Sequence, residues 1–188
     1  MILALTAWWG LATAAGAATA YAVLALASRR LPPASLRIFM LAAWLLHALA
    51  LAEGLLERMA ANGADFTLTF RRLCDAAVGP EGDAGVRALF ADPGAYDTWA
   101  GGWRRRLEEE AASVEEQTAQ MRRVNPVFIP RNHLVEAVIA AAVERQDFQP
   151  FEELLDVVSR PYEDRPEMER YAKPARPEEC VRATFCGT

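Results

Sequence analysis

The sequence is poor in the residues on which most metal and disulfide sites are built. Its 188 residues include three cysteines, two histidines and a single lysine, Lys173. Three cysteines are too few for a disulfide framework. No CxxC pair or Cys/His cluster offers zinc ligands at a usable spacing. A small disulfide-bonded domain and a zinc-stabilised fold are therefore excluded.

Charge is scarce at the start of the chain. Residues 1–56 carry only three arginines (29, 30 and 37) and Glu53, whereas the remaining residues bring the net charge of the whole chain to −5. The chain therefore combines two compositions that suit two different solvents. At 188 residues it has room for one ordinary domain, or for a small domain and a membrane element.

A concentrated basic surface is also missing. The only basic run is Arg104–Arg106, and three glutamates follow it at 108–110. We interpret this run as a solvated helix face with charge pairs at i,i+4. Because binding to nucleic acid requires a clustered basic face, we expect no nucleic-acid partner.

Two apolar runs predict a membrane segment. Met1–Ala27 carries no charge, and as a helix of about 1.5 Å per residue it would span a hydrocarbon core of about 30 Å. A secretory signal peptide is the alternative, although a basic n-region is missing. Ile38–Ala52 reaches spanning length only if it extends past Glu53 to Leu56. We expect a two-helix membrane segment over residues 1–56, with its arginines cytoplasmic and the remainder exported.

The second apolar run contains a histidine. With the composition of residues 1–52, the phrase AWLLHALALA (43–52) resembles the opening spans of a CcsA-type cytochrome c biogenesis membrane protein. His47 lies within this run, and a histidine inside a membrane segment is a candidate haem or metal ligand. The alternative role for His47 is a hydrogen bond inside the membrane segment.

From Glu57 onward the patterns predict helices. Asp92 followed by Pro93 is typical of a helix N-terminus, and the apolar stripe of that helix runs to Val114. Further helices are expected over 131–145 and from near Pro150 to Pro161. The segment DFTLTF (65–70) also fits a short strand, and residues 79–85 are expected to form a loop. The proline-rich segment 161–188 is expected to be extended.

Four phrases occur in order along this second part. They are ADFTLTFRRLCDAA (64–77), MRRVNPVFIPRNHLVEAVIAAA (121–142), RPYEDRPE (160–167) and TFCGT (184–188). Together they resemble the C-terminal part of the selenoprotein O (SelO/YdiU) family. The resemblance implies a kinase-like fold that transfers AMP from ATP to protein hydroxyls, with ATP and Mg²⁺ as cofactors of the intact enzyme.

The chain lacks the motifs with which a kinase-like enzyme binds a nucleotide. A kinase-like site uses a glycine-rich loop, a strand lysine, a catalytic-loop base and a metal-binding aspartate. Lys173 lies in the proline-rich segment, and ADFT (64–67) is not a DFG motif. In the family, the nucleotide-binding core lies upstream of the matching region. Apart from the haem-ligand candidate His47, we therefore expect no catalytic, cofactor or metal residue, and no AMP transfer from this chain alone.

The resemblance carries one functional residue across. Family members bear a redox-active Cys or selenocysteine third from the C-terminus, and Cys186 holds this position. Cys186 is therefore a redox candidate, with Cys180 as its possible partner. An ordinary free thiol is the alternative for Cys186.

These observations predict an all-α chain. We expect a transmembrane hairpin over 1–56, a SelO-like helical region over 57–160 and an extended tail over 161–188, with the kinase core absent. Such a chain would be a truncated or fused SelO-like protein, joined naturally or by an assembly error. The alternatives are a membrane-anchored helical interaction module and, more remotely, a haem-handling fragment. The expected partners are the membrane and a protein, or the missing kinase-like lobe, that would contact Trp99, Trp103, Phe151 and Leu155. The SelO-like part alone would be cytoplasmic.

Overall fold

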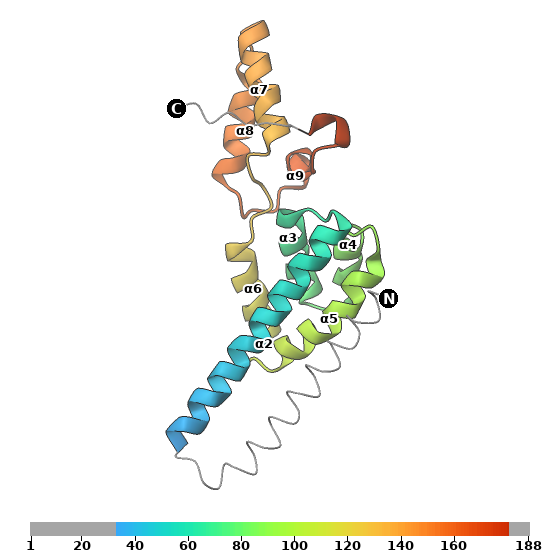
Figure 1. The fold of residues 1–188 in the computed structure, drawn as a ribbon. Coiled ribbons are helices and arrows are strands. Elements are labelled where there is room, and N and C mark those ends of the chain that lie inside the picture. Colours follow the sequence, from blue (N-terminus) through green and yellow to red (C-terminus); the bar gives the residue numbers. More distant parts are fainter. Residues whose placement is uncertain (1–32, 181–188) are drawn as a thin grey trace. The chain divides into compact units, whose positions relative to one another are not determined.

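The computed structural model describes residues 33–180 (Figure 1). Every regular element in this range is a helix. The α-helices are α2 (Pro33–Asn62), α3 (Phe66–Ala76), α4 (Asp83–Arg87), α5 (Pro93–Glu108), α6 (Val114–Val124), α7 (Asn132–Arg145), α8 (Gln149–Ser159) and α9 (Glu169–Ala172). Three 3₁₀ turns join them: η1 (Pro80–Gly82), η2 (Pro166–Met168) and η3 (Pro177–Glu179).

The predicted transmembrane hairpin is wrong. Within residues 33–180, the structure contains no helix with both the length and the apolarity that a membrane crossing requires. The first predicted span, Met1–Ala27, lies outside the described residues. The second, Ile38–Leu56, is only part of α2, which continues to Asn62. The membrane localisation inferred from this hairpin is wrong with it.

The physical reason lies in the second half of α2. The chain divides between Ala50 and Leu51 into two compact units, and this half of the helix belongs to the second unit. Leu55 and Met59 are 2% and 4% exposed, and they pack in a protein core. The apolar residues in this half of α2 are therefore explained in part by burial against protein. A hydropathy pattern cannot distinguish such burial from burial in lipid.

The first core of the second unit is formed by α2, α3, α4 and α5. Tyr96 and Trp99 of α5 pack with Leu55 and Met59 of α2. The indole N–H of Trp99 donates a hydrogen bond to the backbone carbonyl of Leu51 at 2.8 Å. The rest of this core consists of Leu73, Ala76, Val86, Phe90 and Ala100.

Local capping explains where α5 and α6 begin. Asp92 accepts a hydrogen bond from the backbone N–H of Gly94, so α5 starts at Pro93 as predicted. The stripe expected to continue to Val114 is instead divided, because Ser113 and Glu116 form a capping box that starts α6.

The segment that also fitted a strand is helical. Asp65 accepts a hydrogen bond from the backbone N–H of Leu68 at 2.8 Å and caps α3. Leu68, Leu73 and Cys74 are then buried on the helix. The helix is favoured because it places these residues in the interior, whereas strict alternation would leave some of them in solvent.

A second core lies among α7, α8 and α9. Val138 of α7 and Leu154 and Val157 of α8 are buried with Phe128, and Tyr171 of α9 closes the cluster. The predicted helices over 131–145 and from near Pro150 are confirmed as α7 and α8. Residues 79–85, expected as a loop, contain η1 and the start of α4. The described part of the tail forms short helical turns, because Tyr171 and Ala172 are buried.

Candidate functional site

A buried polar group of the second unit centres on Arg71 of α3. Its Nη1 donates hydrogen bonds to the backbone carbonyls of Arg122 at 3.3 Å and Asn125 at 3.0 Å. Its Nη2 donates to the carbonyl of Tyr162 at 3.3 Å and lies 2.7 Å from Asp164 Oδ2. Arg71 is only 4% exposed. One guanidinium thus joins α3, the end of α6 and the segment that follows α8.

Arg122 completes the group from α6. It forms ion pairs with Asp75 of α3 and with Asp164, the latter at 2.5 Å. We call Arg71, Arg122, Asp75 and Asp164 the Arg71 clamp. Burial acts to raise the pKa of Asp164, but Arg71 and Arg122 outweigh it and hold that pKa below its usual value. Charge-assisted bonds of this kind are stronger than neutral hydrogen bonds.

A cleft of about 370 Å³ lies beside the clamp. Its apolar lining includes Leu68, Val127 and Phe128, and its charged lining includes Arg165 and Glu169 as well as the clamp. Every charged member of the clamp already has an ion-pair partner within the chain. The arrangement is suited to holding α3, α6 and the segment after α8 together.

Two further ion-pair groups fix the neighbouring helices. Arg131, just before α7, pairs with both carboxylate oxygens of Asp65 at 2.7 and 3.1 Å. Burial acts to raise the pKa of Asp65, but the hydrogen bonds from Arg131 and the Leu68 N–H hold it below the usual value. In the second group, Asp83 at the start of α4 accepts hydrogen bonds from Tyr96 and Arg104 of α5, both at 2.5 Å.

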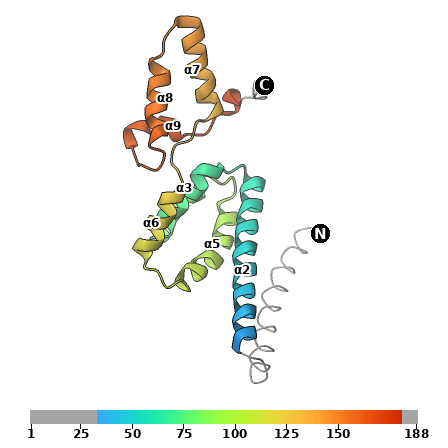
Figure 2. The ribbon, with the colours of Figure 1, turned by 90° about the vertical axis from the view of Figure 1, so that its left-hand side faces the viewer.

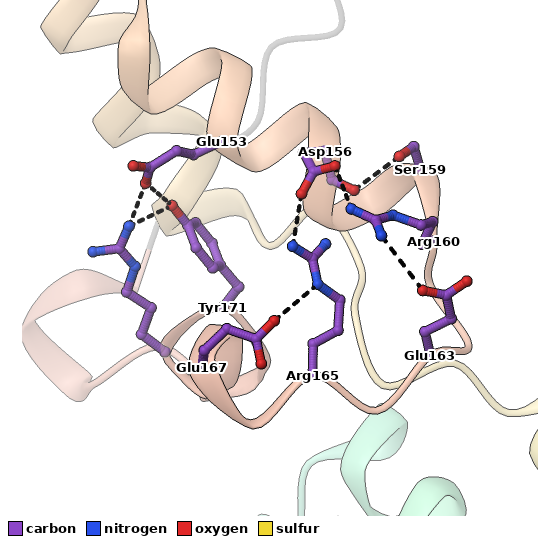
Figure 3. A network of polar contacts seen from close by, with 9 residues as sticks. Glu153, Asp156, Ser159, Arg160, Glu163, Arg165, Glu167 and Tyr171 are labelled. Atoms are coloured by element: carbon purple, nitrogen blue, oxygen red, sulfur yellow. Dashed lines mark hydrogen bonds and ion pairs between the residues drawn. The ribbon is translucent and has the colours of Figure 1, made fainter.

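The segment after α8 is fixed by a network of its own. Figure 3 shows Asp156 of α8 between Arg160 and Arg165. Its two carboxylate oxygens lie 2.5 Å from Arg160 Nη2 and 2.7 Å from Arg165 Nη2. Farther along the network, Glu153 of α8 accepts a hydrogen bond from the Tyr171 hydroxyl at 2.7 Å. Arg170 pairs with the same carboxylate and lies over the Tyr171 ring. These contacts hold residues 160–171 against α8.

The redox candidates fall partly inside the described chain. Cys180 is exposed, and its Sγ donates to the carbonyl of Arg176 at 3.5 Å. Cys186 lies outside the described residues. Cys74, expected to be a small core residue, is 0% exposed, and burial raises the pKa of its thiol.

The structure also places the remaining candidates. His47 is exposed on α2, and over residues 33–180 no group of three His, Cys, Asp or Glu side chains could hold a metal ion. Trp99 is 7% exposed and Trp103 stacks on it at 5.5 Å, so both belong to the first core. Phe151 and Leu155 are 50% and 54% exposed on α8. Of the four expected partner residues, these two keep a large accessible area.

Sequence reasoning missed the Arg71 clamp, although it used the segments that form it. Three of the four phrases that carry the family resemblance, 64–77, 121–142 and 160–167, meet at Arg71. Each supplies an arginine or aspartate of the clamp. The sequence signal was the recurrence of arginine and aspartate in these phrases, but nothing in their spacing along the chain showed that they meet.

Comparison with known proteins identifies these segments. Residues 41–159, more than half of the chain, match the family described as "Protein adenylyltransferase SelO". The chain belongs to the SelO family. The match begins inside the second apolar run, so the whole phrase 43–52 that suggested a CcsA-type protein lies within the SelO-like region. The comparisons do not support the CcsA-type resemblance.

Curated relatives support the same assignment. The chain is 57% identical over 145 residues to the protein nucleotidyltransferase YdiU of Methylorubrum extorquens, covering 74% of this chain and 29% of the relative. It is 58% identical over 138 residues to the YdiU protein of a Bradyrhizobium species, covering 73% and 28%. The chain thus spans less than a third of the length of these relatives.

Proposed function

We propose that this chain is the non-catalytic C-terminal helical region of a SelO-like protein adenylyltransferase, truncated from or fused outside its usual context. The observation that carries the proposal is the SelO match over residues 41–159, together with a coverage of only 28–29% of the relatives. In the intact family, ATP and Mg²⁺ would bind to the upstream kinase-like part. The Arg71 clamp supports a structural role, because its charged groups are bonded to one another and to backbone.

The proposal assigns this region the task of supporting an upstream lobe. Its described charged groups hold helices and the segment 160–171 in place, which gives a defined surface on which another domain can pack. Cys180 and Cys186 remain proposed redox residues of the tail. A helical interaction module is the second candidate function, and the exposed Phe151 and Leu155 favour it.

Reconstitution tests the proposal. The upstream part of the M. extorquens relative, ending where its similarity to this chain begins, is mixed with the purified chain, ATP and Mg²⁺. We expect AMP transfer to protein from the mixture, scored by intact mass, and none from this chain alone. The intact relative is the positive control. AMP transfer by the chain alone, or saturable micromolar ATP binding to it in calorimetry, would contradict the proposal.

A further inference from the structure

The hairpin of α7 and α8 has one covered side and one open side. The two helices run antiparallel (Figure 2) and pack through residues that include Val138 and Leu154. Ala137, which precedes Val138, and Glu153, which precedes Leu154, both line one cleft together with Tyr171. One side of the hairpin therefore faces the α9 segment.

The following residue in each helix lies on the opposite side. Ile139 follows Val138 and Leu155 follows Leu154, so in an antiparallel pair both project from the side away from Tyr171. Val143 lies one turn after Ile139, and Phe148 and Phe151 precede Leu155 at helical spacing. The side chains of this set are between 50% and 77% exposed: Ile139, Val143, Phe148, Phe151 and Leu155. We call this set the α7–α8 face.

The border of this face is acidic. Glu136 lies one turn before Ile139 and Ala140, and Glu152 follows Phe151; both carboxylates are exposed. An apolar patch with a charged border is typical of a protein interaction surface. Electrostatic complementarity then requires a partner with an apolar patch bordered by Lys or Arg.

The length of the relatives indicates which partner covers the α7–α8 face. About seven-tenths of each relative lies outside the region matched by this chain, which covers 28–29% of them. An apolar face left open on the matched region is therefore best explained by contact with the remainder of the same protein. Resting on the proposed function, we propose that the α7–α8 face docks onto the upstream part of a SelO-like protein, through a basic-bordered apolar patch.

Binding measurements with matched variants test this docking. The probe is the upstream part of the M. extorquens relative, and the full chain is titrated by calorimetry as wild type, Phe151→Asp and Leu155→Asp. Truncating or charging a central apolar contact commonly weakens binding by tenfold or more, so we expect each variant to raise Kd by at least about tenfold. Val78→Asp, at a residue that is 63% exposed after α3, is the control and should change Kd less than about twofold. Circular dichroism of each variant verifies that its helices are intact.

A charge variant tests the acidic border independently. Glu152→Arg should weaken binding and reduce its salt dependence, because the border then repels the basic partner. Several outcomes overturn the proposal. Equal Kd values for wild type, Phe151→Asp and Leu155→Asp would place the contact elsewhere. If the wild-type chain sediments as a dimer and Phe151→Asp sediments as a monomer, the partner on this face is a second copy of the chain. If the wild-type chain does not bind the upstream part at all, the proposed function itself fails.

Discussion

Arg71 satisfies three backbone carbonyls and a carboxylate with one side chain. Carbonyls at the end of a helix have no partner within it, and those of Arg122 and Asn125 lie at the end of α6. A buried cation is stable only when it is paired and hydrogen-bonded, and the clamp meets both requirements. Arg71 therefore stabilises the junction of α3, α6 and residues 160–164.

Removing this side chain should destabilise the chain strongly. We expect Arg71→Met to lower the free energy of unfolding by at least about 2 kcal/mol, because each buried acceptor left without a donor costs about 1–3 kcal/mol. The neighbouring Arg72→Met is the matched control. The Arg72 side chain is 48% exposed and lies 3.7 Å from Asp75, so its loss should cost about 0–1 kcal/mol. Urea unfolding of both variants measures the difference, and equal losses would contradict a central role for Arg71.

Asp65 makes the free energy of unfolding depend on pH in the acid range. Its pKa in the folded chain lies below the usual 3.8, so the folded state holds its proton less tightly than the unfolded state. The stabilisation is complete above the unfolded pKa and is lost as pH falls through the folded value. We expect Asp65→Asn to be less stable than wild type at pH 7 and to lose less stability on acidification to pH 3.

The control for this pH prediction is another helix cap. Asp92→Asn keeps a capping side chain at α5 and leaves the Asp65–Arg131 pair intact, so the acid sensitivity due to that pair should remain. Urea unfolding at pH 7 and pH 3 measures all three proteins. If Asp65→Asn and wild type lose the same free energy, the Asp65–Arg131 pair does not contribute to acid sensitivity.

At the scale of elements, two glycines differ in how much space surrounds them. A Cβ on Gly82 would lie 2.3 Å from the backbone of Asp75, whereas a Cβ on Gly101 would meet nothing within 4 Å. Gly82 ends η1 where this turn passes α3, and Gly101 lies inside α5. The two positions therefore predict opposite effects for the same substitution.

We expect Gly82→Ala to destabilise the chain by about 1–3 kcal/mol, since the backbone of α3 or η1 must shift. Gly101→Ala should stabilise it by about 0.5–1 kcal/mol, because alanine is the better helix former. Thermal unfolding of the two variants gives the signs directly. A stabilised Gly82→Ala would show that α3 and η1 do not approach as closely as described.

Elements with strong local signals could be predicted from the sequence. The Asp92-Pro93 start of α5 and the apolar spacing of α7 and α8 have local causes, and these helices are where the patterns placed them. The end of α5 was missed because its apolar stripe continues in phase past Glu108. The clamp was missed because contacts across more than 90 residues, as between Arg71 and Tyr162, leave no spacing signal.

At the scale of the whole molecule, the apolar run of α2 shows how composition misled. Its apolar residues near Leu55 serve a protein core, and the family match begins at residue 41. A hydropathy signal alone therefore does not show that this part of the helix packs in a protein core. The tertiary contacts of Leu55 and Met59 show it, and these contacts depend on α4 and α5, which come later in the chain.

The cysteines report whether the second unit folds without the rest of a SelO-like protein. Cys74 is fully buried in α3, with its Sγ donating to the Phe70 carbonyl, while Cys180 is exposed. Thiolate is the reactive form, and burial raises the Cys74 pKa, so Cys74 can be alkylated only when the structure opens. We expect native alkylation of Cys180 to be at least roughly a hundredfold faster than that of Cys74, and Cys186 is labelled in the same experiment.

Timed labelling followed by peptide mass spectrometry measures all three rates in one sample. The same experiment in concentrated urea is the control, because unfolding should bring the three rates close together. Comparable rates for Cys74 and Cys180 in native buffer would show that the isolated chain does not keep α3 packed. The clamp and the first core would then depend on the upstream part of the family. A hundredfold difference would show that α3 stays packed in the isolated chain, and with it the first core and the Arg71 clamp.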